Sequence, residues 1–114
     1  KRLMSVCVTD SNDVFVVGAD GLILHYDGIN WIRQRSSTDN WLRRIWGIDS
    51  NNIFAVGDSG TILCYDGTKW NKQKSGTNYL LLGIWGNKKD NIYVVGINSS
   101  SHYNHMLDVS YGTK

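Results

Sequence analysis

The sequence predicts an all-β protein built from a repeated unit of four short antiparallel strands, and three observations support this fold class. Residues 14–28, VFVVGADGLILHYDG, recur at 53–67 as IFAVGDSGTILCYDG, 39 residues further along the chain. Short apolar runs are separated by turn dipeptides such as Asp-Gly, which is the pattern of strands joined by hairpins. No segment keeps a helical period for long enough to form a helix.

The repetition extends over most of the chain. Comparing 13–51 with 52–90 gives 17 identities in 39 pairs, and a third copy opens at Asn91 with NIYVVG. The first residues also fit, because LMSVCVTDSND at 3–13 aligns with LRRIWGIDSNN at 42–52. A repeat of this kind decides the fold class, because each copy is one structural unit that packs on its neighbours.

The second copy contains the expected strands in order. LRRIWG at 42–47 is the first strand and ends at the turn-like DSNN, and NIFAVG at 52–57 is apolar on both faces. TILCYDG at 61–67 alternates and then breaks at Asp-Gly, a strong hairpin signal. KWNKQKSG at 69–76 is a polar outer strand with one large aromatic residue. Four strands joined by tight turns therefore fill one repeat.

The tight turn between the second and third strands is GDSG, residues 57–60. A turn of this kind uses glycine where φ is positive. We therefore expect Gly57 and Gly60 to be less replaceable than Ser59.

Strands that are apolar on both faces need a neighbouring sheet on each side. A repeat of about 40 residues with four strands has the size of one β-propeller blade. The chain is thus predicted to form one repeat domain over 1–114, with blades at about 2–38, 41–77 and 80–114, the last without its outer strand. This is an incomplete propeller, or a ring closed by association of copies. The alternative is a β-trefoil, in which three four-stranded repeats close one barrel.

The pattern IWG…NIFAVGDSGTILxYDGxxW resembles the bacterial propeller repeats of the YVTN and BNR (Asp-box) families over residues 3–114. The resemblance implies the propeller fold and favours an extracytoplasmic location in a bacterium, but such repeats serve many functions. Asp58-Ser59-Gly60 keeps the D-x-G of an Asp box without the tryptophan at its usual spacing, and Asp20-Gly21 is shifted by one position. Both are degenerate forms of that motif.

Several residues that repeat at this offset have structural interpretations. The outer-strand tryptophans are expected to be buried, and the inner-strand tryptophans to pack between blades. Each turn aspartate precedes a glycine and is expected to cap its turn by accepting hydrogen bonds from backbone amides. These residues are the outer Trp31 and Trp70, the inner Trp46 and Trp85, the turn aspartates Asp27 and Asp66, and the strand-ending glycines Gly18, Gly57 and Gly96.

The third copy departs from this pattern after VVG at 94–96. If the last three residues match the second copy, the offset has grown from 39 to 45, so six residues are inserted. Leu107 and Val109 then fall on Ile62 and Cys64, which restores the apolar alternation.

The inserted loop, around 98–105, contains His102, Tyr103 and His105. A polar loop that is present in one copy only is the most distinctive candidate for ligand specificity. His-x-x-His is a metal-binding spacing, but no third ligand is near in the sequence, so no metal or cofactor is predicted.

Two aromatic residues flank the connections from an outer strand to the next inner strand. Trp41 and Tyr79 are predicted to share one face of the molecule with Asp20, Asp58 and the inserted loop. Aromatic rings beside Asp, Asn and Ser can hold a sugar through stacking and hydrogen bonds, and they fit a protein contact equally well.

Composition excludes several classes. The net charge is +2 and the arginine pairs at 33/35 and 43/44 are interpreted as solvated strand faces, so no nucleic-acid interface is expected. No apolar run approaches the roughly 18–20 residues that span a bilayer. Cys7 and Cys64 occupy different repeat positions and are interpreted as small apolar residues.

The sequence thus predicts a non-enzymatic binding or interaction module, part of a larger repeat protein, that recognises a protein or a glycan on one loop face. No catalytic motif is present. One alternative is a piece of a BNR-like glycan-processing enzyme, similar to sialidases, whose catalytic residues lie outside this chain. A second alternative is a purely architectural domain.

Fewer than three complete blades leave two apolar faces to be covered by further blades or by a second copy of the chain. The faces are expected around Val6, Val14 and Val16 at one end and around Ile92, Val94 and Leu107 at the other.

Overall fold

The computed structural model describes residues 2–88, 91–97 and 106–111, and they form an all-β protein, as predicted. Two short 3₁₀ turns, η1 (Ala19–Gly21) and η2 (Asp58–Gly60), lie between strands. The strands are β1 (Leu3–Asp10), β2 (Asp13–Gly18), β3 (Ile23–Tyr26), β4 (Trp31–Arg33), β5 (Leu42–Asp49), β6 (Asn52–Gly57), β7 (Ile62–Tyr65), β8 (Trp70–Gln73), β9 (Leu80–Lys88), β10 (Asn91–Ile97) and β11 (Met106–Tyr111).

The first two sheets have four antiparallel strands each, in the orders β1-β2-β3-β4 and β5-β6-β7-β8. Equivalent strands begin 39 residues apart, from Leu3 and Leu42 in the first strands to Trp31 and Trp70 in the last. Each sheet is a simple meander in which consecutive strands are neighbours. The strand order expected for one repeat is therefore confirmed in both sheets.

The third sheet has the order β11-β10-β9 among the described residues, and its register corrects the sequence alignment. Val109 pairs with Val94, and in the second sheet Leu63 pairs with Ala55, which lies 39 positions before Val94. Val109 thus takes the place of Leu63 rather than Cys64, the offset is 46 (109 − 63), and the insertion has seven residues (46 − 39). The predicted register was wrong by one residue, a shift that exchanges the two faces of a strand.

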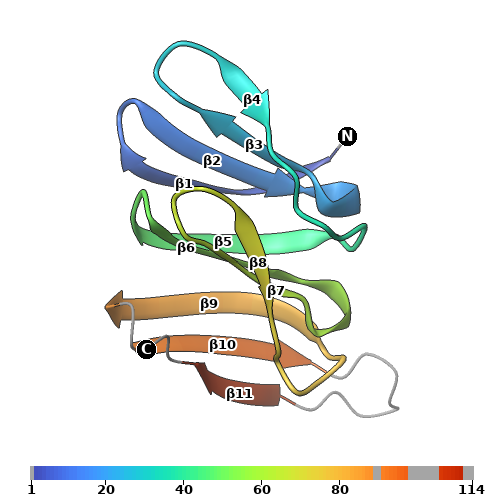
Figure 1. Cartoon of the computed structure of the whole chain (residues 1–114). Helices are drawn as coiled ribbons and strands as arrows, with labels where there is room; N and C mark the ends of the chain where they lie inside the picture. Colours follow the sequence, from blue (N-terminus) through green and yellow to red (C-terminus); the bar gives the residue numbers. More distant parts are fainter. Residues whose placement is uncertain (1, 89–90, 98–105, 112–114) are drawn as a thin grey trace.

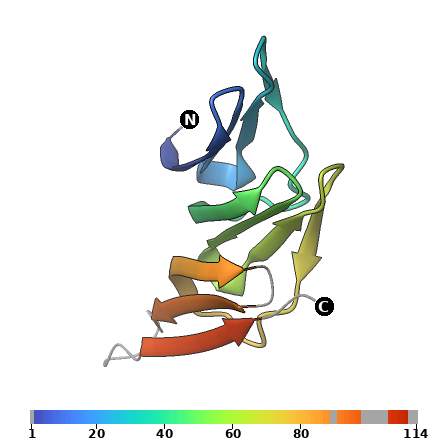
Figure 2. The same ribbon diagram turned by 90° about the vertical axis from the view of Figure 1, so that its left-hand side faces the viewer.

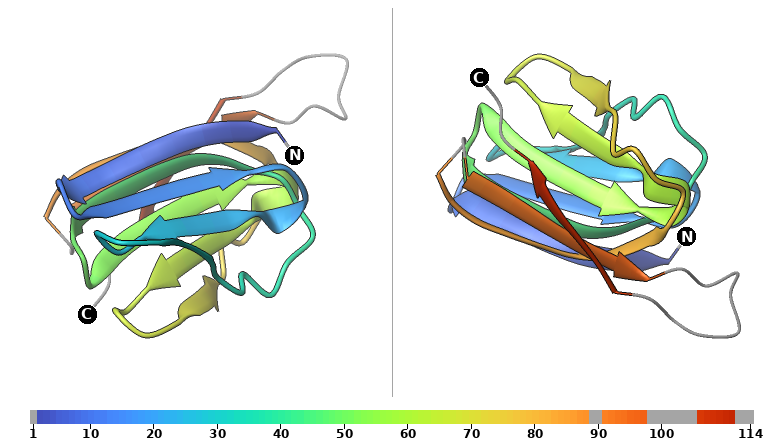
Figure 3. Two further views of the ribbon diagram at one scale, coloured as in Figure 1. Left: turned by 90° about the horizontal axis from the view of Figure 1, so that it is seen from above. Right: turned by 90° about the horizontal axis from the view of Figure 1, so that it is seen from below.

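The three sheets lie one above another in Figure 1, and Figure 2 shows the same layers from the side. The first strands of the sheets are neighbours, because β5 packs against both β1 and β9. Seen from above and below in Figure 3, the strands of successive layers run in similar directions with a gradual rotation. Each sheet remains open among the described residues, so the single closed barrel of the trefoil alternative is not formed.

Two apolar clusters fill the spaces between the sheets. The first cluster, between the first and second sheets, consists of Cys7, Phe15, Val17, Ile23, Leu42, Ile45, Ile53, Ala55, Leu63, Tyr65 and Trp70. The second cluster, between the second and third sheets, consists of Phe54, Val56, Ile62, Leu81, Ile92 and Val94, with Trp46, Cys64, Tyr79 and Ile84 packed against it. Burial of each large apolar side chain stabilises the fold by roughly 1.5–3 kcal/mol, so contacts between sheets hold the stack together.

The position of a sheet in the stack decides whether its repeated tryptophans are buried. Trp70 is 5% exposed in the first cluster, whereas Trp31, expected to be equally buried, is 54% exposed. Trp46 packs against the second cluster, but Trp85 is 60% exposed, so it does not have the packing role expected of it. Trp31 and Trp85 point outward at the two ends of the stack, where no sheet among the described residues covers them.

The predicted end faces are half right. Val6 is 59% exposed, as expected for the first end. Ile92 and Val94, expected on the other open face, are instead buried against the second sheet. The side chain of Leu107 lies outside the described residues. The outward face of the third sheet carries Trp85, because successive side chains of a strand alternate between the two faces.

The glycine at the end of each second strand is required by a close backbone approach rather than by its φ. Gly57 has φ −171°, which is extended backbone, but a Cβ there would lie 1.9 Å from the carbonyl oxygen of Trp41. That oxygen accepts a hydrogen bond from the amide of Asp58, 3.0 Å away. The positive φ values in this turn belong to Ser59 (56°) and Gly60 (69°), so the expected positive φ is found at Gly60 and not at Gly57. The relative replaceability of Gly57, Gly60 and Ser59 stays a prediction.

Candidate functional site

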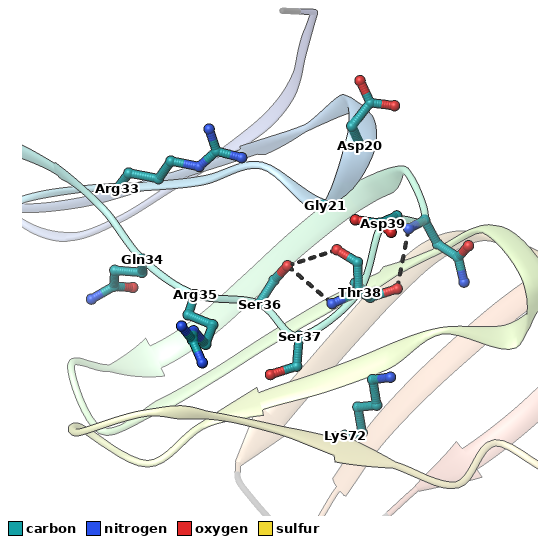
Figure 4. Close-up of a pocket in the computed structure, with 11 residues that line it drawn as sticks. Asp20, Gly21, Arg33, Gln34, Arg35, Ser36, Ser37, Thr38, Asp39 and Lys72 are labelled. Atoms are coloured by element: carbon teal, nitrogen blue, oxygen red, sulfur yellow. Dashed lines mark hydrogen bonds between the residues drawn. The ribbon is translucent and has the colours of Figure 1, made fainter.

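A polar cleft of about 850 Å³ opens where the first and second sheets meet, beside η1 and the connection from β4 to β5 (Figure 4). One wall carries Asp20 from η1 and Arg33 from the end of β4, and the other carries Lys72 from β8. The connecting loop, residues 34–40, forms the floor between them. The first and second sheets, which are consecutive in the sequence, therefore both contribute residues to the cleft.

The floor is held by hydrogen bonds of its own side chains. The buried Ser36 hydroxyl donates to the carbonyl of Thr38 at 3.1 Å and accepts from the amide of Thr38 at 3.4 Å. The Thr38 hydroxyl accepts from the amide of Asn40 at 3.1 Å, and the Asn40 side chain donates to the hydroxyl of Thr61 at 2.9 Å. Ser37, between them, has φ 66°. The loop is thus tied both to itself and to the second sheet, and it presents polar groups to the cleft.

The charged side chains of the cleft are exposed and form no ion pairs with other described residues. Arg33, Arg35 and Lys72 supply three positive charges, and Asp20 and Asp39 supply two negative ones. The ion pairs found among the described residues involve none of these five side chains. A ligand with an acidic group can therefore bind the cations without first breaking a contact within the protein.

The predicted aromatic platform is occupied by arginine. The guanidinium carbon of Arg43 lies 4.8 Å from the ring centroid of Trp41, and that of Arg2 lies 5.8 Å away. Arg43 also donates to both carboxylate oxygens of Asp58, at 2.8 and 3.2 Å. The Trp41 ring is thus engaged by guanidinium groups, and its predicted ligand role stays a prediction. Tyr79 is half-buried against the second cluster.

The structure divides the predicted site residues between separate places. Trp41 and Asp58 meet through Arg43, while Asp20 lies in the polar cleft. Asp58 lines a smaller hollow with Arg43, Ser59, Asn78 and Leu80. His102, Tyr103 and His105 lie outside the described residues.

Sequence reasoning missed the role of Arg43, which was interpreted as part of a solvated face. Its side chain is only 26% exposed and that of Asp58 30%. The signal was present in the repeat, because the first copy has Met4 and Ala19 at these two positions and therefore lacks both partners together. Paired departure from a repeat is a sign of contact.

A second polar cluster, also missed, surrounds His25. Its Nε2 lies 2.5 Å from Oδ1 of Asp13, and its ring stacks on Phe15 with centroids 4.1 Å apart. The other carboxylate oxygen of Asp13 accepts a hydrogen bond from the hydroxyl of Thr9. The hydroxyl and the imidazole therefore contact the same carboxylate rather than each other. A nucleophile activated by histidine needs the hydroxyl–imidazole contact, which this arrangement lacks.

Gln34 extends this cluster across the first interface. Its side-chain carbonyl accepts a hydrogen bond from Nε1 of Trp70 at 2.8 Å, and its amide nitrogen lies 3.5 Å from Nδ1 of His25 and 3.4 Å from the hydroxyl of Tyr65. The buried indole N–H is thereby satisfied. This bridge between two sheets indicates a structural role for the His25 cluster.

The turn aspartates have the capping role that was predicted. Oδ1 of Asp27 accepts from the amides of Ile29 and Asn30, and Oδ1 of Asp66 accepts from those of Thr68 and Lys69, at 2.8–3.0 Å. Hydrogen bonds from the Lys69 and Thr68 amides lower the pKa of Asp66 to about 2. The amide of Asn30, followed by that of Ile29, lowers the pKa of Asp27.

The two cysteines are free thiols in apolar surroundings. Cys7 is buried in the first cluster and Cys64 packs against the second. Burial raises the pKa of both thiols, and Asp13 adds to the effect at Cys7 and Asp66 at Cys64. A raised pKa lowers the thiolate fraction and hence reactivity.

Within the described ranges, no three His, Cys, Asp or Glu side chains are placed to hold a metal ion together. The part of the chain that the structure describes also contains no helix with the length and apolarity needed to cross a membrane.

Comparison with known proteins adds no assignment, since no family model, no curated protein and no solved structure matches the chain. The resemblance to YVTN and BNR repeats therefore stays a prediction from the sequence.

Proposed function

We propose that this chain is a non-enzymatic binding module of the β-propeller type, in which each sheet is one blade. Three features support the proposal: consecutive strands of each sheet are neighbours, equivalent strands of the first two sheets begin 39 residues apart, and the first strand of the second sheet packs on those of the other two. In a propeller, the first strands of the blades likewise line a common centre.

We infer that the ligand is an acidic oligosaccharide bound in the polar cleft, and the observation that carries this is the group of three cations around it, which form no ion pair within the described part of the chain. A guanidinium group matches a carboxylate or sulfate with two parallel hydrogen bonds, which favours Arg33 and Arg35 as contacts for an acidic sugar. The hydroxyl and amide groups of Ser37 and Asn40 suit the neutral hydroxyls of the same ligand.

A glycan fits the cleft better than a protein partner does. Protein interfaces gain most of their binding energy from aromatic and apolar anchors in pockets. The cleft is lined by charged and polar side chains, with Asp20 on one wall and Lys72 on the other. The nearby Trp41 ring is engaged by arginine. Among the described residues, we find no observation that favours the alternative of a glycan-processing enzyme.

A glycan array followed by calorimetric titration tests the proposal. Carboxylated and sulfated oligosaccharides should bind, and neutral oligosaccharides of the same length should not. Arg33→Ala and Arg35→Ala should each weaken binding about tenfold or more, since a hydrogen bond to a charged group contributes roughly 1.5–3 kcal/mol.

Arg44→Ala is the matched control, because Arg44 is an exposed arginine outside the cleft that donates to the carbonyl of Arg43. Its affinity should equal that of the unmodified chain. Equal binding of acidic and neutral sugars, or equal losses for Arg33→Ala and Arg44→Ala, would refute the assignment of the cleft.

A further inference from the structure

The two ends of the stack carry exposed apolar side chains on flat sheet faces. On the first sheet, Leu3, Val6 and Trp31 are 56%, 59% and 54% exposed. On the third sheet, Trp85 is 60% exposed and Tyr93 40%. Apolar groups gathered on one face are typical of a surface that another protein covers. We define the first group as the leading face and the second as the trailing face.

The second sheet shows what covers a surface equivalent to the leading face. The residues 39 positions later, Leu42, Ile45 and Trp70, are 0%, 8% and 5% exposed. They are buried because the first sheet lies on them in the first cluster. The leading face is therefore a copy of a surface that, one layer further, is covered by a sheet of the same kind.

The trailing face carries the other half of the same interface. Trp85 is equivalent to Trp46 and Cys7, and Tyr93 is equivalent to Phe54. Within the stack, Cys7 lies in the first cluster, and Phe54 and Trp46 lie in or against the second. In both interfaces the first strands of the two sheets pack on each other. Phe15, the first-sheet equivalent of Tyr93, also contacts Trp70, the second-sheet equivalent of Trp31, with ring centroids 6.1 Å apart. The trailing face thus presents an aromatic set to a surface of the leading type.

We propose that the trailing face of one copy of this chain binds the leading face of a second copy, extending the internal stack from chain to chain. The occupant is a second copy because the chain carries both halves of an interface that it already forms twice internally. The contact is heterologous, since the two faces differ, and a pair of copies joined at both ends closes a ring with two-fold symmetry. This inference does not depend on the proposed ligand.

Two single-face variants test the contact. Val6→Asp places a charge on the leading face and Trp85→Asp places one on the trailing face, and both side chains are exposed, so each variant should fold. The unmodified chain should associate in sedimentation velocity at high micromolar concentration. Each variant alone should be monomeric, because every possible pair then includes one blocked face.

Mixing the two variants is the decisive measurement. The intact leading face of the Trp85→Asp variant should bind the intact trailing face of the Val6→Asp variant. The mixture should therefore form a one-to-one heterodimer and no larger oligomer. A monomeric unmodified chain would overturn the proposal. So would a dimer formed by either variant alone, since that contact joins two like faces.

Ile29→Asp is the matched control for introducing a charge at an exposed apolar residue. Ile29 is 82% exposed in the turn before β4, and its equivalent Thr68 remains exposed in the second sheet. This variant should associate like the unmodified chain. Circular dichroism of every variant checks folding, and Leu3→Asp and Tyr93→Asp repeat the test at independent positions of the two faces. A charge at Ile29 that abolishes association equally would also overturn the proposal.

Discussion

The first and second sheets have closely similar sequences and the same strand order, yet equivalent residues lie in different surroundings. Trp31 is 54% exposed and Trp70 is 5% exposed, although each occupies the start of an outer strand. The second sheet has a neighbour on both sides, whereas the first sheet has one among the described residues. A residue of a repeat is therefore core or surface according to the layer that lies beside it.

The two sheets also differ in which polar residues occupy equivalent positions. The Arg43–Asp58 pair occurs in the second sheet and not in the first. The Asp13–His25 pair occurs in the first sheet and not in the second, which has Asn52 and Cys64 at the equivalent positions. Apolar positions thus repeat the architecture, while the charged positions that differ between copies give each layer its own surface. Binding specificity is expected to reside in the latter.

The largest expected effect tests the difference between the tryptophans. Trp70→Ala should lower the free energy of unfolding by about 3–5 kcal/mol, because it removes a buried aromatic side chain and leaves a cavity. Trp31→Ala should cost less than about 1 kcal/mol in the monomer, since exposed positions seldom contribute more. Urea denaturation of both variants measures this, and equal losses would show that Trp31 is covered in solution.

The second prediction concerns a position that should not differ between the sheets. Gly57→Ala and Gly18→Ala should each destabilise by about 1–3 kcal/mol, the usual effect of overpacking. An added Cβ would lie 1.9 Å from the carbonyl oxygen of Trp41 at Gly57, and 2.1 Å from that of Arg2 at Gly18.

Gly76→Ala is the control for these glycines, because Gly76 has φ 76° and nothing within 4 Å of the added Cβ. It should cost only the backbone strain of about 1 kcal/mol. Thermal unfolding of the three variants ranks them, and a smaller loss at Gly57 than at Gly76 would contradict the close-approach explanation.

A smaller effect is expected from the ion pair that only the second sheet has. A double-mutant cycle with Arg43→Ala and Asp58→Ala should give a coupling energy of about 0.2–1 kcal/mol, because both side chains are partly exposed and screened by water. The coupling should fall as salt is added. A coupling that is unchanged by salt would contradict this ion-pair assignment.

The smallest effect concerns a feature that both sheets share. The pKa of Asp66 is lowered from 3.8 to about 2 by backbone hydrogen bonds in the folded state. Because the folded pKa lies below the unfolded one, the stabilisation is complete above about pH 4 and is lost as the pH falls through about 2. Asp66→Asn should therefore flatten the pH dependence of the urea midpoint in this range, and Asp27→Asn should act in the same direction. An unchanged slope in both variants would show that the caps do not couple to folding.

Features that depend on neighbouring residues along the chain were predictable. The strand order of the first two sheets, the turn at Asp66-Gly67 and its capping all follow from side-chain alternation and turn chemistry. These are local properties, so a segment expresses them wherever it lies in the fold. The repeat added the offset that relates one sheet to the next.

The candidate site was less predictable because its contacts join segments that are distant in the sequence. Lys72 shares the polar cleft with Arg33, which is its equivalent 39 residues earlier, but the repeat alone does not show that the two side chains line one cleft. Trp41 meets Asp58 through Arg43, and no repeat offset links these three residues. The repeat pattern emphasised the residues that recur identically, whereas in the second copy lysines replace Arg33 and Arg35, and Asp20 and Asp39 have the neutral equivalents Ser59 and Asn78.

The sequence by itself determined the strands, their hairpin order and the 39-residue repeat, because alternation and turn preference act over a few residues. Only the tertiary structure decided which face of each sheet is covered, in which register β11 pairs with β10, and which charged side chains form ion pairs. Burial and ion pairing are set by the neighbours that folding supplies. Tryptophans at equivalent positions of the repeat can therefore lie in the core of one sheet and on the surface of another.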